Sequence, residues 1–288
     1  MLARTGEELL KICEEESISL SEYAIRIEMR DRELSREEVY KKMAKNLKVM
    51  KDGATEGREK QVNSLSGLIG GDGYRVQKYL EKGNTLTGDI TVKAMAMALS
   101  SSEVNASMGR IVACPTAGSC GILPAVILSA GEKLGKSDEE LIDALFASAA
   151  VGMIIGMNAT LSGCQAECGS AAAMGAAAVV EMMGGTPKMS LDAAAIVIKN
   201  VLGLVCDPVA GLVEIPCAKR NAAGAISALC TADMVMAGVS SKITFDDTVS
   251  AMYKVGKSLP SSLRETALGG VAVTKSGLEL RKKVFGEE

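Results

Sequence analysis

Three cysteines stand next to residues that shape the backbone, and they are the strongest chemical signal in the chain. Cys164 follows a glycine, Cys206 precedes an Asp-Pro pair, and Cys217 follows a proline. Glycine and proline mark turns and close backbone approaches, which cysteines kept only for packing rarely border. Thiolates that converge from loops or helix ends can hold an iron–sulfur cluster, and three of them leave one iron open as a Lewis acid. The pattern favours a metal or iron–sulfur site within residues 163–224.

Eight cysteines are present, and their spacing alone does not decide which of them converge. Cys164 and Cys168 can share a helix face because they are four residues apart. Cys13 and Cys230 stand on apolar, helix-like stretches and are interpreted as small buried hydrophobic residues. The first sixteen residues are charged and lack the apolar stretch of a secretory signal, so we expect a cytoplasmic, reducing location.

The 288 residues include no histidine, which excludes several familiar mechanisms. A Ser-His-Asp triad, a Cys-His pair and a His-ligated zinc cannot be built from this chain alone. Any general base must be Glu, Asp, Lys, Tyr or Cys, or must come from a partner chain. The formal net charge of −3 and an aromatic content of 3%, without tryptophan, argue against nucleic-acid binding.

A second segment rich in turn residues is ACPTAGSCGILP, residues 113–124. Its prolines and glycines frame a turn that presents the hydroxyls of Thr116 and Ser119 together with backbone N–H groups. We expect a helix over residues 122–130, whose N-terminal dipole would favour a substrate carboxylate at this turn. The alternative is an ordinary connection between two helices.

Residues 64–73 form a glycine-rich run, SLSGLIGGDG. Such a run can cradle an anionic group on backbone N–H donors. It lacks the GK[ST] sequence of a P-loop and no convincing strand precedes it, which argues against nucleotide binding. A tight turn is the alternative.

The elements that must position these segments are predicted to be helices. Long runs of small and aliphatic residues follow residue 93, and the period-two alternation of strands hardly occurs. Helix starts are expected at Ser35 and Ser137, each followed by acidic residues, and at Ser190, which begins a Ser-Leu-Asp sequence. The sequence therefore predicts an all-α fold, with a compact helical catalytic domain built from buried helices rich in small residues.

Three regions are expected along the chain. Residues 1–50 are predicted to form an arm of amphipathic helices, either contacting another subunit or packed on the same domain. Residues 51–62 are polar, carry two glycines and are predicted to be a linker-like segment. Residues 63–288 are assigned to the helical catalytic domain. Within them, residues 144–157 are strongly apolar but fewer than the roughly 20 that span a bilayer, so a buried central helix is preferred over a membrane helix.

Three motifs in this order resemble those of a known enzyme family. They are PTAGSCGILP at residues 115–124, GCQAECG at residues 163–169 and CDPVAGLVEIPCAKRN at residues 206–221. They are similar to the iron–sulfur-dependent L-serine dehydratases, also called L-serine ammonia-lyases, and specifically to the α subunit of the two-chain type. The resemblance extends over residues 15–277, and SGLIGGD at residues 66–72 resembles a further glycine motif of that family.

The resemblance implies a 4Fe–4S cluster held by Cys164, Cys206 and Cys217, with its fourth iron open to L-serine. It also implies an all-helical catalytic domain, a separate β subunit, and conversion of L-serine to pyruvate and ammonia without pyridoxal phosphate. No binding of nucleic acid or membrane is expected.

Roles for other residues follow as hypotheses. Glu167, one helical turn from Cys164, is a candidate base or hydrogen-bonding partner. Lys219 and Arg220, shortly after Cys217, could place a positive charge near the substrate anion. The residues expected to bind the substrate are Ser66, Gly67, Thr116, Gly118, Ser119 and Asn221.

Two departures from the family pattern concern the base and the cluster. Single-chain relatives are expected to have a C-terminal cysteine that reaches the cluster, whereas this chain ends in FGEE. Because the chain also lacks histidine, a base from the β subunit is a further hypothesis. The alternatives for function are a related lyase acting on cysteine or another small amino acid, and a non-catalytic iron–sulfur subunit.

Overall fold

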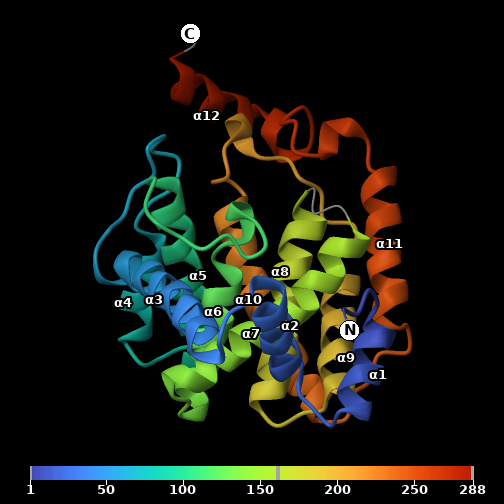
Figure 1. Ribbon diagram of the computed structural model, residues 1–288. Helices are drawn as coiled ribbons and strands as arrows, with labels where there is room; N and C mark the ends of the chain where they lie inside the picture. The colour runs from blue at the N-terminus through green and yellow to red at the C-terminus, as the bar shows by residue number, and fades with distance from the viewer. Residues whose placement is uncertain (1, 160–162, 287–288) are drawn as a thin grey trace.

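The computed structural model describes residues 2–159 and 163–286, which form twelve α-helices and four short 3-10 helices (Figure 1). The α-helices are α1 (Gly6–Glu15), α2 (Leu20–Arg32), α3 (Arg36–Glu59), α4 (Asp72–Leu80), α5 (Asp89–Ala106), α6 (Ile122–Leu134), α7 (Asp138–Asn158), α8 (Cys164–Met182), α9 (Pro187–Asn200), α10 (Cys217–Met236), α11 (Phe245–Ser258) and α12 (Lys275–Phe285). The 3-10 helices are η1 (Ala117–Ser119), η2 (Val209–Gly211), η3 (Ser261–Leu263) and η4 (Gly270–Val273). The described residues contain isolated bridges but no strand, so the prediction of an all-α fold is confirmed.

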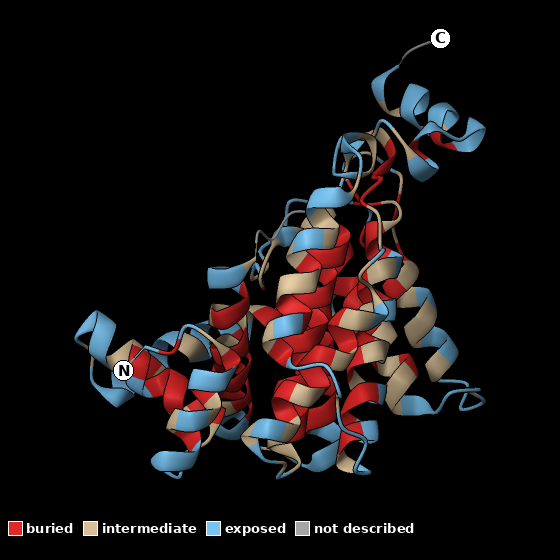
Figure 2. Cartoon of the chain, turned by 90° about the vertical axis from the view of Figure 1, so that its right-hand side faces the viewer, coloured by how far each residue is buried: buried red, intermediate tan, exposed pale blue. Residues whose placement is uncertain are grey.

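Helix α8 lies in the middle of the bundle (Figure 1) and is buried along nearly its whole length. Figure 2 shows that buried residues gather in the interior of the molecule and exposed ones at its periphery. It packs against α6, α7, α9 and α10. Small residues permit this close approach. A Cβ on Gly175 of α8 would lie 3.1 Å from the Val126 side chain of α6, and one on Gly224 of α10 would lie 2.8 Å from that of Ile122. Because interiors are close-packed, larger residues at these positions would push the helices apart.

Helix α7 is, among the helices described, the one long and apolar enough to cross a membrane. However, 61% of its most apolar window is buried inside the protein, where α7 packs against α2 and α8. The helix also begins with three consecutive acidic residues. Such burial is typical of a core helix, which is the interpretation preferred from the sequence.

Helix starts follow the predicted capping residues in α3 and α7 but not in α9. The hydroxyls of Ser35 and Ser137 each accept the N–H of a glutamate three residues later, and each glutamate side chain bonds back to the serine N–H. These are capping boxes. Helix α9 instead begins at Pro187 with Thr186 as its cap. The predicted start at Ser190 is wrong because the threonine cap and a proline at the first helical position begin the helix earlier.

The predicted linker, residues 51–62, is helical as far as Glu59 because α3 continues through it. Its two glycines bring α3 against α5. The Ser100 hydroxyl of α5 donates to the carbonyl of Gly53 at 2.6 Å and accepts the N–H of Gly57 at 2.8 Å. The expectation of a linker is therefore wrong for residues 51–59, where glycine serves close packing between helices. The division into domains stays a prediction.

We expect Gly57→Ala to lower the free energy of unfolding by about 1–3 kcal/mol, because the added methyl group overpacks the contact between α3 and α5. A Cβ at this position would lie 2.9 Å from Ser100 Cα. Urea denaturation followed by circular dichroism measures the effect. Gly156→Ala in α7 is the matched control, since no atom lies within 4 Å of its Cβ position and alanine favours helix. Equal unfolding midpoints for Gly57→Ala and the wild type would contradict the prediction.

Candidate active site

Four cysteine side chains meet at the end of the bundle where α8 and α10 begin. Interaction with the side chains of Cys168, Cys206 and Cys217 lowers the pKa of Cys164. The same interaction, together with burial, raises the pKa values of Cys168, Cys206 and Cys217, because each would have to lose its proton beside a thiolate. The structure thus brings together the three cysteines predicted as metal ligands and adds Cys168.

Two of these thiols lie at helix N-termini. Cys164 is the first residue of α8 and Cys217 is the first residue of α10, and neither helix has a side-chain cap. The partial positive charge of a helix N-terminus stabilises a thiolate. Gly163 adopts a φ of +83°, a conformation that favours glycine, and a Cβ there would lie 3.6 Å from Cys206 Cβ. The backbone residues that border the cysteines therefore position the thiols.

The chemistry of the donor set is compatible with an iron–sulfur cluster. Among the residues that the structure describes, no three or more Cys, Asp or Glu side chains are grouped as ligands of one ion. The side chains of Cys168, Cys206 and Cys217 all influence the Cys164 thiol. Iron–sulfur clusters are held mainly by cysteine thiolates, and this group offers thiols without histidine, stabilised by two helix N-termini. The residues present fit such a cluster.

Arg220 adds a positive charge beside the thiols. Its guanidinium lies 3.4 Å from the Cys164 sulfur and donates to the carbonyl of Val205 at 2.8 Å. It also pairs with the buried carboxylate of Asp207 at 2.9 Å. Because three groups fix the guanidinium, it is held against the thiolate rather than left mobile in solvent. The structure places Arg220 in the candidate site, as predicted, but next to a sulfur.

A segment that the sequence did not single out lies across the Cys206 loop. The N–H of Cys206 donates to the carbonyl of Leu263 at 2.9 Å, and the carbonyl of Cys206 accepts the N–H of Glu265 at 3.0 Å. The Glu265 carboxylate accepts the N–H of Gly163. Further along, the N–H of Val271 donates to Asp207 at 2.7 Å. Residues 261–273, near the top of Figure 1, thus tie together the loops that carry the cysteines.

Glu167 lies one helical turn after Cys164 and faces the turn of residues 115–121. The Thr116 hydroxyl forms a hydrogen bond with its carboxylate. A Cβ on Gly118 would lie 3.4 Å from Glu167 Oε2, and the hydroxyl oxygens of Thr116 and Ser119 are 3.2 Å apart. Burial raises the pKa of Glu167, although the hydrogen bond from Thr116 opposes the increase. The structure therefore places a carboxylate suited to accepting a proton beside the two predicted hydroxyls.

Asn221 joins this turn to α10. Its amide nitrogen donates to the carbonyls of Gly118 at 2.8 Å and Cys217 at 2.9 Å, and its amide oxygen accepts the N–H of Gly121 at 2.9 Å. Both donor hydrogens of the amide are used by these carbonyls. Asn221, predicted to bind substrate, thus holds the turn against a cysteine.

Ser66 lies in a tight turn and faces a buried glutamate that the sequence did not single out. Its hydroxyl donates to Glu214, with distances of 2.9 and 2.7 Å to the two carboxylate oxygens, and its oxygen accepts the N–H of Leu68 at 3.0 Å. Gly67 has a φ of +73°, and its N–H bonds within the turn. Of the two interpretations of the glycine-rich run, the tight turn describes these residues.

Lys219 is directed to another part of the molecule. It pairs with Asp72 at the start of α4, and its side chain is 58% exposed. The buried Glu103 of α5 supports the same helix end by accepting the N–H groups of Asp72 at 2.5 Å and Gly73 at 3.3 Å. Lys219 thus contributes to the anchoring of α4, and its predicted catalytic role has no geometric support in the described contacts.

Glu103 should make the stability of the protein depend on pH. Burial raises its pKa from 4.5 to about 7, although the two N–H donors oppose the increase. The folded state therefore binds this proton more tightly than the unfolded state does. The resulting stabilisation is complete below the unfolded pKa of 4.5 and is lost as the pH rises through about 7.

We expect Glu103→Gln, which stays neutral, to lose less stability than the wild type between pH ~4.5 and ~8. Thermal unfolding across this range measures the difference, with Glu14→Gln at an exposed position of α1 as the control. Parallel Tm curves for Glu103→Gln and the wild type would contradict the prediction.

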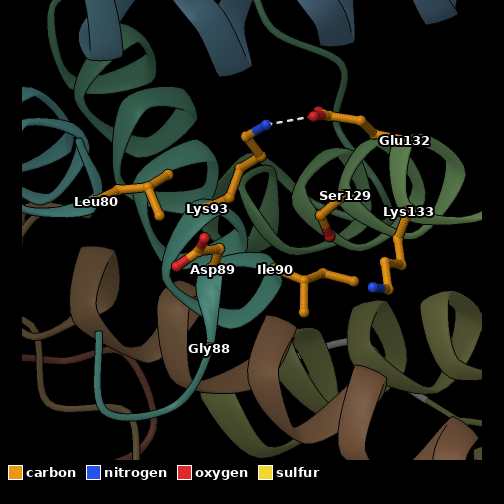
Figure 3. Close-up of a pocket in the computed structure, with 8 residues that line it drawn as sticks. All are labelled: Leu80, Gly88, Asp89, Ile90, Lys93, Ser129, Glu132 and Lys133. Atoms are coloured by element: carbon orange, nitrogen blue, oxygen red, sulfur yellow. Dashed lines mark hydrogen bonds and ion pairs between the residues drawn. The ribbon is translucent and has the colours of Figure 1, made fainter. Parts of the chain in front are cut away.

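A large hollow of about 800 Å³ lies elsewhere, between the start of α5 and the end of α6 (Figure 3). Lys93 and Glu132 form an ion pair beside it, so these two charges already satisfy each other. The hollow is lined by Leu80, Gly88, Asp89, Ile90, Lys93, Ser129, Glu132 and Lys133. Because the lining contains no cysteine and none of the predicted site residues, size alone does not make it the active site.

The fold and the site together define a class of protein: an all-helical protein with a buried thiol group at two helix N-termini, beside a carboxylate and two turn hydroxyls. A family described as the serine dehydratase alpha chain matches residues 15–272. The chain therefore belongs to the serine dehydratase alpha chain family. This match confirms the resemblance found in the motifs and covers nearly the same residues.

Individual relatives agree with the family match. The chain is 47% identical over 287 residues to a probable L-serine dehydratase, alpha chain, of Bacillus subtilis (strain 168), which covers 98% of this chain and 95% of that protein. It is 44% identical over 290 residues to the L-serine dehydratase, alpha chain, of Peptoniphilus asaccharolyticus, covering 99% of each. It is 35% identical over 285 residues to L-serine dehydratase TdcG of Escherichia coli (strain K12), covering 92% of this chain but 60% of that protein.

Proposed function

We propose that the chain is the α subunit of an iron–sulfur-dependent L-serine dehydratase that converts L-serine to pyruvate and ammonia. Relatives that carry the name L-serine dehydratase align with nearly all of it. The single observation that carries the proposal is the group formed by Cys164, Cys206 and Cys217 beside the carboxylate of Glu167. This arrangement combines a potential cluster site with a potential base.

The three cysteines are proposed to hold a 4Fe–4S cluster. When bound, a cluster with one iron free of protein ligands supplies a Lewis acid for the hydroxyl of serine. Arg220 stabilises the Cys164 thiolate, and Asp207 keeps the guanidinium in place. The helix N-termini at Cys164 and Cys217 add to this stabilisation.

The remaining residues of the site bind the substrate and move its proton. Thr116, Ser119 and the N-terminus of α6 hold the substrate carboxylate. Glu167 accepts the α-proton at a carboxylate oxygen, and its burial makes this carboxylate more basic than an exposed glutamate. Loss of the α-proton and the β-hydroxyl leaves an enamine, which hydrolyses to pyruvate and ammonia.

A β chain is proposed as the partner of this cytoplasmic enzyme. The matched family is named for an alpha chain, and the chain spans 60% of the longer TdcG protein, which therefore contains further sequence. Because this chain has no histidine, a base supplied by the β chain is the alternative to Glu167. Pyridoxal phosphate is not part of the proposal.

Anaerobic reconstitution with iron and sulfide, with and without the β chain, tests the proposal. The expected result is a cluster whose absorption spectrum shifts with L-serine, together with formation of pyruvate and ammonia. A cluster that is indifferent to L-serine and forms no pyruvate would favour a non-catalytic iron–sulfur subunit. Faster turnover of L-cysteine than of L-serine would favour the related lyase.

A further inference from the structure

Glu214 is a buried residue in the loop between Cys206 and Cys217, with an exposed fraction of 5%. Its hydrogen-bonding partner among the described side chains is the neutral hydroxyl of Ser66. The cations that follow it in the chain are engaged elsewhere, since Lys219 pairs with Asp72 and Arg220 with Asp207. Within the described residues, no ion pair compensates the charge of Glu214.

A buried carboxylate without a cation is costly, because it loses hydration and gains no opposite charge in return. The hydroxyl of Ser66 compensates this loss only in part. Ser66 itself is fixed, since its oxygen accepts the N–H of Leu68 at 3.0 Å. A cationic group that binds here would supply the missing charge and would be bound more strongly than at the protein surface.

The position of Glu214 connects it to the candidate site. Val213 directly precedes Glu214 in the chain. A Cβ added to Gly118 would lie 3.6 Å from the Val213 side chain and 3.4 Å from Glu167 Oε2. The carbonyl of Glu214 accepts the N–H of Ala218 in the first turn of α10. The residue before Glu214 therefore borders the turn whose hydroxyls and following helix N-terminus favour an anion. A site with an anion-binding side and an adjacent carboxylate suits a zwitterion such as an α-amino acid.

We propose that Glu214 binds the α-ammonium group of the substrate and that Ser66 holds the Glu214 carboxylate in place. The inference rests on the proposed function, because it assumes that an amino acid occupies this site. It also changes the role of Ser66, which the sequence analysis expected to bind the substrate directly. A substrate carboxylate beside Ser66 would approach the like charge of Glu214, which is unfavourable.

The first test compares L-serine with 3-hydroxypropanoate, which is serine without the amino group, on the active wild-type protein. If a buried carboxylate binds the ammonium, 3-hydroxypropanoate should inhibit with a Ki about 10- to 100-fold above the KM of L-serine. Equal values for the two molecules would overturn the inference without any mutant.

The second test uses Glu214→Gln, which keeps the shape of the side chain and an acceptor for Ser66 but removes the charge. The expected result is a rise in KM for L-serine of about 10- to 100-fold, a smaller change in kcat, and an unchanged Ki for 3-hydroxypropanoate. Glu103→Gln, which replaces another buried carboxylate, should keep the wild-type KM. Thermal unfolding checks that each variant is folded. If Glu214→Gln does not fold, the comparison of L-serine with 3-hydroxypropanoate on the wild-type protein still tests the inference.

Different results would contradict the proposed function and the proposed role of Glu214. Wild-type protein that forms no pyruvate from L-serine under any reconstitution condition would overturn the proposed function, and the role of Glu214 with it. Turnover of L-serine with an unchanged KM in Glu214→Gln would overturn only the role of Glu214. A parallel loss of affinity for L-serine and 3-hydroxypropanoate would show a general disturbance of the site and would also overturn it.

Discussion

Cys206→Ala is expected to abolish cluster assembly and to reduce pyruvate formation from L-serine by more than about 100-fold. The helical fold should persist, because Cys206 bonds to Leu263 and Glu265 through its backbone, which alanine retains. Iron and sulfide content after anaerobic reconstitution and the absorption spectrum measure the loss of the cluster, and a pyruvate assay measures the loss of activity. Circular dichroism verifies that the protein is folded.

Two other cysteines provide controls for this experiment. Cys230 of α10 is exposed, so the interpretation of this residue as buried is wrong, and Cys230→Ala should keep both cluster and activity. Cys168→Ala removes the fourth thiol of the group and, if three cysteines suffice, should keep the cluster and its response to L-serine. Full iron content in Cys206→Ala would refute the proposed ligand set, and loss of the cluster in Cys168→Ala would extend that set to four.

Glu167→Gln is expected to reduce kcat by about 10²- to 10⁴-fold, the usual contribution of a general base. Glutamine keeps the size of the side chain and an acceptor for the Thr116 hydroxyl, but it cannot take the α-proton. Cluster content and the spectral shift on adding L-serine should remain, because these report on binding and not on proton transfer. Steady-state and single-turnover kinetics with L-serine measure the effect.

The pH profile gives a second measurement of Glu167. Burial raises its pKa above 4.5, so the acid limb of kcat/KM should lie at a higher pH than for an ordinary glutamate, with activity rising as the carboxylate loses its proton. Glu265→Gln should move the acid limb to lower pH, because the neighbouring carboxylate of Glu265 also raises the pKa of Glu167, while glutamine keeps an acceptor for the N–H of Gly163. A Glu167→Gln variant with near-normal kcat would place the base elsewhere, such as on the β chain.

Several features were predictable from the sequence because local signals encode them. Glycine at position 163 and proline at position 216 place Cys164 and Cys217 at helix starts, and such turn residues act within a few positions along the chain. The capping boxes at Ser35 and Ser137 are equally local. The all-α class followed from the absence of strand periodicity. Thr186 and Ser190 are both possible helix caps, and α9 begins after the earlier one, where a proline follows the threonine.

Long-range contacts decided the rest of the candidate site. Glu214 and Asp207 lie inside a motif already recognised, but only the structure shows that Ser66 faces one and Arg220 the other. Similarly, Lys219 and Arg220 are neighbours in sequence, yet one pairs with α4 and the other lies against a thiol. Adjacent residues on a helix point in directions about 100° apart, so the surrounding elements determine their partners.

The sequence by itself determined which residue types are available for chemistry: thiols bordered by turn residues, no histidine, and helices rich in small residues. The tertiary structure decided which of the eight cysteines converge, and it added Cys168 and the support from residues 261–273. It also showed that the glycines of residues 51–59 serve helix packing and not a linker. The physical reason is that turn and capping preferences act over a few residues, whereas the convergence of side chains depends on how whole helices pack.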